Sequence, residues 1–109
     1  MELEYDNWTG KFNEVKTALI RSVAQYNVHY SKLKIGITNN PERRVVEHDK
    51  ANLGWKKMIV KYQTSSVNYI NEMEKIIIDH HWDIVANEVG GGGGPNAKTG
   101  PYYLYFLLK

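Results

Sequence analysis

Residues 33–48 read LKIGITNNPERRVVEH, and this stretch decides how the chain folds. Its first six residues alternate apolar with polar or small side chains, which is the period of a β-strand that buries one face. Asn39 or Asn40 can then cap a helix whose first residue is Pro41, where a missing N–H does no harm. The sequence therefore predicts a strand, a short turn and a helix.

Arg44 and His48 lie four residues apart on that helix and so share one face, close to the point where Lys34 leaves the strand. The cations Lys34 and Arg44 and the imidazole of His48 are thus expected to lie close together. An amphipathic helix with a solvent-exposed polar face beside a sheet edge is the alternative explanation of the same spacing.

This strand and helix resemble the second half of the GIY-YIG nuclease signature. In that family a strand that ends in a tyrosine, a variable residue and a glycine is followed, after a short turn, by a helix that carries a phosphate-binding arginine. Gly36 matches the glycine, Arg44 matches the arginine, and Lys34 stands where the family usually has the second tyrosine. Some restriction enzymes that resemble this family carry lysine there, and an ammonium group can help to lower the pKa of an attacking water. The resemblance implies phosphodiester hydrolysis.

Composition sets the limits of this interpretation. The chain has 109 residues, enough for one domain spanning 1–109 with one core. Fourteen Lys and Arg against twelve Asp and Glu leave a net charge of +2, so affinity for nucleic acid must come from local clustering. The absence of cysteine excludes disulfides, thiolate zinc sites and cysteine nucleophiles. No apolar stretch approaches the length of a membrane span, and we expect a soluble cytoplasmic (intracellular) protein.

The remaining patterns predict an α/β (α+β) fold with a small three-stranded antiparallel sheet flanked by three helices. Residues 1–30 are expected to form an N-terminal helical extension, since apolar residues recur at three- and four-residue steps from 12 to 26. Residues 57–63 and 102–108 have the composition of strands, and Ser65 or Ser66 can cap a helix over 67–85. Residues 90–101 begin with five glycines and are expected to form a loop.

Glu74 is the second candidate for chemistry. The three-four spacing of residues 67, 70, 74, 77, 81 and 84 predicts one helical stripe with this carboxylate among apolar residues. A buried carboxylate needs a partner, either a cation such as Arg44 or Lys34, or a metal ion. The nuclease resemblance implies that Glu74 binds one Mg²⁺ or Mn²⁺, and a single carboxylate with waters and substrate oxygens suits magnesium. Glu72, on a different face of the helix, is the less favoured alternative.

Asn87 follows this helix, as an asparagine usually does in the family. Its amide could hold the glutamate or a neighbouring backbone segment in place, or it could simply end the helix in the left-handed conformation. His80 and His81 invite a metal interpretation, but adjacent helical residues point about 100° apart, and His81 fits a core position better.

The first tyrosine of the signature is missing from its usual place before residue 33. The C-terminal stretch 102–108 reads YYLYFLL and resembles the opening strand of small bacterial family members. We therefore predict a circular permutation, in which this strand pairs antiparallel with 33–38 and Tyr105 faces the same side as Lys34. Tyr103 could replace Tyr105, and Tyr30 is the candidate if there is no permutation. An amphipathic edge strand explains the same tyrosines without chemistry.

Together these features predict a metal-dependent endonuclease. Tyr105, deprotonated or sharing its proton with Lys34, would orient or deprotonate a water molecule. Arg44 would stabilise charge on the phosphoryl oxygens, and His48 would relay protons or contact phosphate. We assign Lys34 and Asn87 to the catalytic group as well, and Tyr103, Gly36, Thr38 and Arg43 to substrate binding. The expected partner is nucleic acid, DNA rather than RNA, with no membrane; a homodimer is left open. The alternative is a GIY-YIG-like module that binds nucleic acid or a nucleotide and has lost catalysis.

Overall fold

Residues 1–87 and 99–109 are described in a computed structural model and form four strands and three helices of the α+β class. The strands are β1 (Glu2–Trp8), β2 (Leu33–Thr38), β3 (Lys57–Thr64) and β4 (Tyr102–Leu108). The helices are α1 (Phe12–His29), α2 (Pro41–Ala51) and α3 (Val67–His80). The predicted strands at 33–38, 57–63 and 102–108 are therefore confirmed.

The four strands form one sheet in the order β1-β3-β4-β2. β4 is a central strand that pairs antiparallel with both β2 and β3, so the predicted pairing of 102–108 with 33–38 is confirmed. β1 pairs parallel with β3 at the far edge. The expectation of a purely antiparallel three-stranded sheet is wrong, because β1 makes the sheet mixed and four-stranded.

β1 also corrects the prediction of a wholly helical extension over residues 1–30. Its apolar residues Leu3 and Tyr5 alternate with Glu2, Glu4 and Asp6, which is a strand pattern. The signal is weak because β1 is an edge strand with most of its side chains exposed, so few apolar residues are needed. Only the segment from Phe12 onward is helical, as its apolar spacing predicts.

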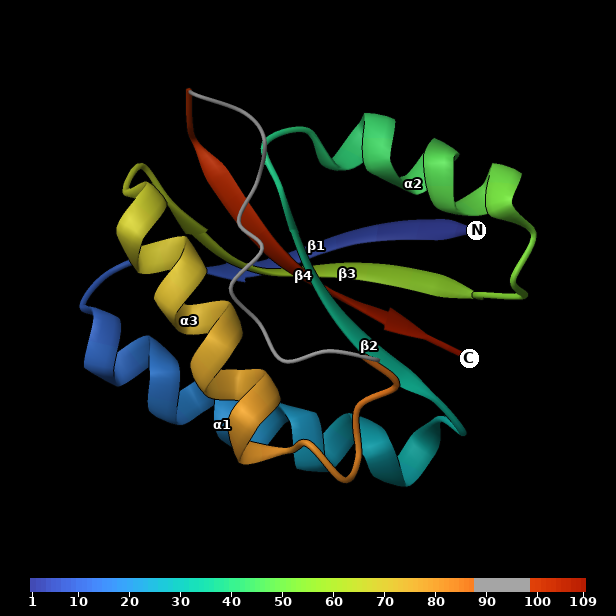
Figure 1. The fold of residues 1–109 in the computed structure, drawn as a ribbon, viewed down its shortest axis with the longest axis horizontal. Coiled ribbons are helices and arrows are strands. Elements are labelled where there is room, and N and C mark those ends of the chain that lie inside the picture. Colours follow the sequence, from blue (N-terminus) through green and yellow to red (C-terminus); the bar gives the residue numbers. More distant parts are fainter. Residues whose placement is uncertain (88–98) are drawn as a thin grey trace.

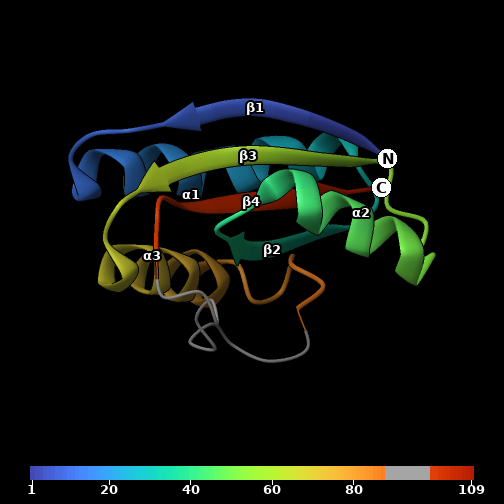
Figure 2. The same cartoon turned by 90° about the horizontal axis from the view of Figure 1, so that it is seen from above.

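The helices cover the two faces of the sheet unequally. Figures 1 and 2 show α1 and α3 against one face and α2 against the other. The larger core lies under α1 and α3 and includes Leu19, Phe106 and Ile77, which are fully buried. The smaller core lies under α2 and contains five buried residues, Val45, Met58, Val60, Tyr105 and Leu107. β4 contributes to both cores through alternate residues, as its register requires.

The pairing of β3 with both β1 and β4 brings the two chain termini close together. Lys57 of β3 pairs with Glu2 on one side and with Leu108 on the other, so the first and last strands are separated by a single strand. Figure 1 shows both termini at the same end of the sheet.

α3 ends earlier than predicted. It begins after Ser66, whose side chain accepts a hydrogen bond from the Tyr69 N–H, but it stops at His80 rather than at Val85. Val85 forms a bridge with Leu33, and the Ala86 N–H donates to the Leu33 carbonyl at 2.7 Å. This segment leaves the helix because it pairs with the open edge of β2. Most of the predicted glycine loop, including Gly90–Gly94, lies outside the described residues.

None of the helices in the described part of the chain has the length and hydropathy needed to cross a membrane.

Candidate active site at the β2–α2 junction

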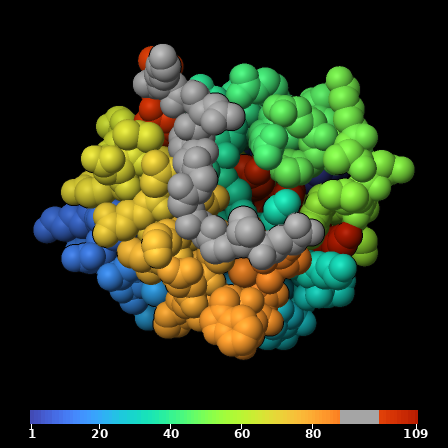
Figure 3. All heavy atoms as spheres, in the orientation of Figure 1, coloured from blue at the N-terminus to red at the C-terminus, as the bar shows by residue number. Residues whose placement is uncertain are grey.

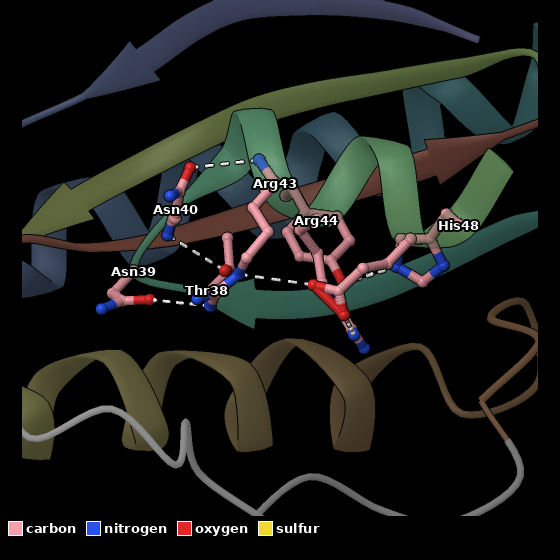
Figure 4. A network of polar contacts seen from close by, with 8 residues as sticks. Thr38, Asn39, Asn40, Arg43, Arg44 and His48 are labelled. Carbon is pink, nitrogen blue, oxygen red and sulfur yellow. Dashed lines mark hydrogen bonds and ion pairs between the residues drawn. The ribbon is translucent and has the colours of Figure 1, made fainter. Parts of the chain in front are cut away.

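The turn between β2 and α2 is built by side-chain hydrogen bonds that fix where α2 begins. Thr38 Oγ1 accepts a hydrogen bond from the Asn40 N–H at 3.1 Å. Asn40 Oδ1 in turn accepts from the Arg43 N–H at 3.1 Å, so Asn40 rather than Asn39 is the cap, with Pro41 next to it. Figure 4 shows this chain of contacts from Thr38 to Arg43. The cap sets the rotation of α2 and hence the direction of Arg44.

Tyr105 lies directly opposite Gly36 in the β2–β4 register. A Cβ atom at position 36 would lie 2.3 Å from both Cζ and the hydroxyl oxygen of Tyr105, which is a severe overlap. The tyrosine ring therefore occupies the space that any other side chain would fill. Gly36 positions the ring rather than contributing a functional group.

The Tyr105 hydroxyl joins the two helical residues that the spacing placed on one face. Arg44 Nε donates to it at 3.2 Å, and His48 Nε2 lies 2.9 Å from it. The His48 and Tyr105 rings meet edge to face at 5.7 Å between centroids. Arg44 and His48 share one face of α2, as their spacing predicts, and meet at the hydroxyl of Tyr105 from β4. Lys34, the other cation of the predicted convergence, is not hydrogen-bonded to this hydroxyl among the described residues.

The electrostatics of the cluster determine which atom holds the proton. Burial, together with the positive charges of Arg44 and Lys34, lowers the pKa of His48 to about 4. Burial raises the pKa of Tyr105, against the opposing effect of Arg44. At neutral pH the imidazole is therefore neutral and the phenol is protonated. The guanidinium can only donate, so the Tyr105 oxygen accepts from Arg44, and with the imidazole proton on Nδ1 the Tyr105 O–H donates to His48 Nε2.

Glu74 approaches the cluster from α3 across the β2 edge. Its side chain is half-buried, and its negative charge contributes to the raised pKa of Tyr105. The apolar stripe of α3 differs from the predicted one, since Met73 is fully buried between Ile70 and Ile77, whereas Val67 is exposed. Glu74 thus lies at the border of the buried face and not in its middle. Glu72 is exposed.

The donor set around Glu74 restricts the kind of metal site that could form. Among residues 1–87 and 99–109 there is no group of three or more His, Cys, Asp or Glu that could hold an ion. An all-protein cage of the zinc type does not fit these residues. One carboxylate that shares an ion with waters and substrate oxygens does fit, and this is the arrangement magnesium commonly adopts.

Lys34 shares the Tyr105 face of the sheet but is placed opposite Leu107. Within the described residues its ammonium makes no hydrogen bond or ion pair with the protein. Its observed effect is electrostatic, through the pKa of His48. The expected proton sharing between Tyr105 and Lys34 is therefore absent from this arrangement, and Arg44 and His48 take that place at the hydroxyl.

Asn87 fixes the backbone of β2. Its Oδ1 accepts from the Ile35 N–H at 3.0 Å, and its Nδ2 donates to the Ile35 carbonyl at 2.9 Å. Both backbone groups point away from β4, so the amide completes the outer edge of the strand. Of the alternatives left open by the sequence, support of a neighbouring backbone segment is the one observed, one residue from Gly36.

The remaining candidates are only partly brought together. Tyr103 lies on the Tyr105 face and packs against the smaller core. Arg43 is largely exposed and pairs with Glu47 at 3.4 Å. Tyr30 packs against the larger core, on the opposite face of the sheet, and so does not reach the site. His81 is buried and lies 2.7 Å from the Ile20 carbonyl through Nε2, which is a core position.

Sequence reasoning missed Glu47. Its carboxylate lies 3.3 Å from Arg44 Nη1 and also pairs with Arg43, so it holds the guanidinium whose Nε reaches Tyr105. The three- and four-residue spacing of Arg43, Arg44 and Glu47 was the available signal.

The surface above the cluster is hollowed. Figure 3 shows atoms of β4, in red, at the bottom of a depression beside α2. Tyr105 itself is 2% exposed, so a ligand in this depression would meet Arg44 and His48, which are half-buried, before the tyrosine ring.

Comparison with protein-family models, with curated proteins and with solved structures finds no match for this chain.

Proposed function

We propose that this protein is a metal-dependent endonuclease that hydrolyses phosphodiester bonds of nucleic acid, with a circularly permuted GIY-YIG-like site. The observation that carries the proposal is the hydrogen-bonded cluster of Tyr105, Arg44 and His48, with Glu74 in electrostatic contact with it. Three elements that are distant in sequence contribute to it, α2, α3 and β4. A packing role alone would not require an arginine, a neutral histidine and a carboxylate around one hydroxyl.

Three features support the permuted arrangement. Tyr105 stands opposite Gly36, on the strand that pairs with the signature strand. The chain ends are separated by one strand, which is the proximity that permutation needs. Asn87 supports the same strand from its other edge. In this proposal the resemblance to the family covers residues 33–87 directly, and the permutation adds residues 102–108.

The residues suggest how water would be activated. Tyr105 accepts a proton from water while its own proton passes to His48, which is neutral and 2.9 Å away. Arg44 Nε stabilises the developing charge on the phenol oxygen, and the exposed part of its guanidinium is available for a phosphoryl oxygen. Lys34 adds positive charge on the same face. Glu74 is the residue that would hold Mg²⁺ or Mn²⁺, which when bound supplies charge neutralisation at the leaving oxygen.

Cleavage of labelled single- and double-stranded DNA and RNA, with and without Mg²⁺ or Mn²⁺, tests the proposal. We expect Glu74→Gln and Arg44→Ala each to reduce the cleavage rate by about 100-fold or more. Glu72→Gln and Arg21→Ala are the matched controls, because both residues are exposed and lie away from the cluster. Tyr105→Phe should abolish cleavage and Tyr103→Phe should not, which separates the two tyrosines.

Two results would contradict the proposal. Cleavage that survives Glu74→Gln and Arg44→Ala would mean that the activity comes from elsewhere or from a contaminant. Binding of nucleic acid without cleavage under any metal condition would favour the alternative, a module that keeps the fold and binds nucleic acid.

A further inference from the structure

A second site lies at the opposite edge of the sheet from the cluster. An open pocket of about 640 Å³ is lined by the end of β1, the second half of α1 and Lys61 of β3. Its volume is within the range of small-molecule sites. β1 and β2 are the two outer strands, so the sheet separates this pocket from Tyr105.

The pocket is built around a buried lysine. The register of β3 against β4 shifts between Val60 and Tyr62, so Lys61 is the extra residue of a β-bulge relative to β4. The register against β1 shifts between Tyr5 and Trp8, where β1 has one residue more than β3. Its side chain is 4% exposed, and Nζ donates to Asp6 Oδ2 at 2.8 Å and to the Tyr26 hydroxyl at 3.4 Å. An ammonium has three donors, and these are its two partners among the described residues. One donor therefore remains for an acceptor in the pocket.

The pocket also has a flat aromatic wall and several amides. Trp8 lines it and is 50% exposed, a large apolar surface on an edge strand. The Asn7 amide is held by Gln63 at 3.1 Å, and Gln25 presents a second amide from α1. Tyr26, which stacks under the Lys61 ammonium at 5.3 Å, adds another ring.

These groups restrict the chemistry of a ligand. The Lys61–Asp6 pair is neutral overall, and an anion placed on Lys61 would meet the Asp6 carboxylate. A purely apolar ligand would leave the amides without hydrogen bonds, at a cost. A planar heteroaromatic ring can stack on Trp8 and exchange hydrogen bonds with amides along its edge, as nucleobases do with proteins.

We propose that this pocket binds a purine or pyrimidine ring, stacked on Trp8 with its polar edge toward Gln25 and Lys61. The ring can belong to a free nucleoside or to an unpaired base of a strand, and the chemistry of recognition is the same. The inference does not depend on the nuclease site, because none of the pocket residues belongs to the Tyr105 cluster.

Titration with uncharged nucleosides, followed by two-dimensional NMR in the presence of a metal chelator, tests the proposal. We expect millimolar nucleoside to shift the Trp8 indole N–H and the amide signals of Asn7 and Gln25. Trp8→Ala should weaken binding by about 5- to 150-fold, the range for loss of one stacked base. Trp82→Ala is the matched control, because Trp82 is 76% exposed and lies beyond the end of α3.

Gln25→Ala gives a second test that does not involve the aromatic ring, and Asn27→Ala, on another face of α1, is its control.

A single-stranded oligonucleotide distinguishes the two sources of the base. If it binds more tightly than the nucleoside and loses this gain in Trp8→Ala, the source is a base within a strand. Nucleoside binding without such a gain would identify a free nucleoside. Either result supports the proposal.

Three results would overturn it. Absence of any shift at millimolar nucleoside would mean that the pocket does not recognise bases. Equal shifts with inorganic phosphate would mean an anion site at Lys61. The third result combines two variants: the Trp8 signals no longer shift in Arg44→Ala, and Trp8→Ala keeps its affinity for the nucleoside. This result would place nucleoside binding at the Tyr105 cluster.

Discussion

Gly36→Ala tests whether the Tyr105 ring is held in place by the missing side chain opposite it. The new methyl group would lie 2.3 Å from two ring atoms and 2.8 Å from a third, so the buried ring must move. Overpacking of this kind costs about 1–3 kcal/mol. Alanine recovers about 0.5–1 kcal/mol of the entropic cost of glycine in a strand. The difference between these ranges is about 0–2.5 kcal/mol. Because the methyl group overlaps three atoms of a buried ring, we expect the free energy of unfolding to fall by about 1–2 kcal/mol.

The ring shift should also loosen the hydroxyl cluster. Displacement of the ring that packs against His48 would expose the imidazole to solvent and reduce the burial that lowers its pKa, so this pKa, measured by NMR titration, should rise from about 4 toward the ordinary value of 6.5. Urea unfolding followed by tryptophan fluorescence gives the stability in the same samples. A decrease in stability together with this pKa rise would identify the ring as the group that moved.

Tyr105→Leu provides the control in a double-mutant cycle, since it removes the ring that the methyl group meets. In that background Gly36→Ala should cost nothing or increase stability slightly, which gives a coupling energy of at least about 1 kcal/mol. Two findings would refute the reasoning: an unchanged stability of Gly36→Ala in the native background, or the same cost in both backgrounds.

Three further predictions concern the same region and its supports. Because His48 has a lowered pKa in the folded protein, the unfolded state binds more protons between about pH 4 and 6.5. The free energy of unfolding should therefore fall as the pH falls through this window. Urea unfolding of His48→Gln should show a smaller decrease over the same window. Asn87→Ala leaves the Ile35 N–H and carbonyl without their partners and should lower stability by about 1–3 kcal/mol; hydrogen exchange of the Ile35 amide should accelerate, and an unchanged rate would contradict the strand-support role. Ser66→Ala removes the cap of α3 and should cost about 1 kcal/mol, whereas Ser65→Ala, at the exposed neighbour, should change stability little; equal effects in thermal unfolding would argue against the cap.

The β2–α2 unit was predictable because its determinants are local. The alternation of residues 33–38, the asparagine cap and Pro41 all act within ten residues, and they fix the helix face that carries Arg44 and His48. The pairing of the last strand with residues 33–38 was predicted from the family resemblance, since the composition of residues 102–108 by itself indicates a strand but not its partner.

The errors have a common physical origin in tertiary contacts. β1 needs few apolar residues because only one edge and part of one face are covered, so its acidic sequence gave a weak strand signal. α3 stops at His80 because the following segment pairs with β2, a partner that helical spacing cannot reveal. The sequence did not reveal which side chains would hydrogen-bond to the Tyr105 hydroxyl, because this depends on how far each side chain extends in the folded protein. Arg44 and His48 lie within hydrogen-bond distance of it, and Lys34 does not.

The central position of β4 has a consequence for biosynthesis. β2 and β3 are not neighbours, and only β4 connects them into one sheet. This strand emerges from the ribosome after every other element of the domain, so neither core can close on a nascent chain that stops short of it. Tyr105 arrives with it. The proposed catalytic site, which needs Tyr105, is therefore complete only after this last strand of the sheet has been made.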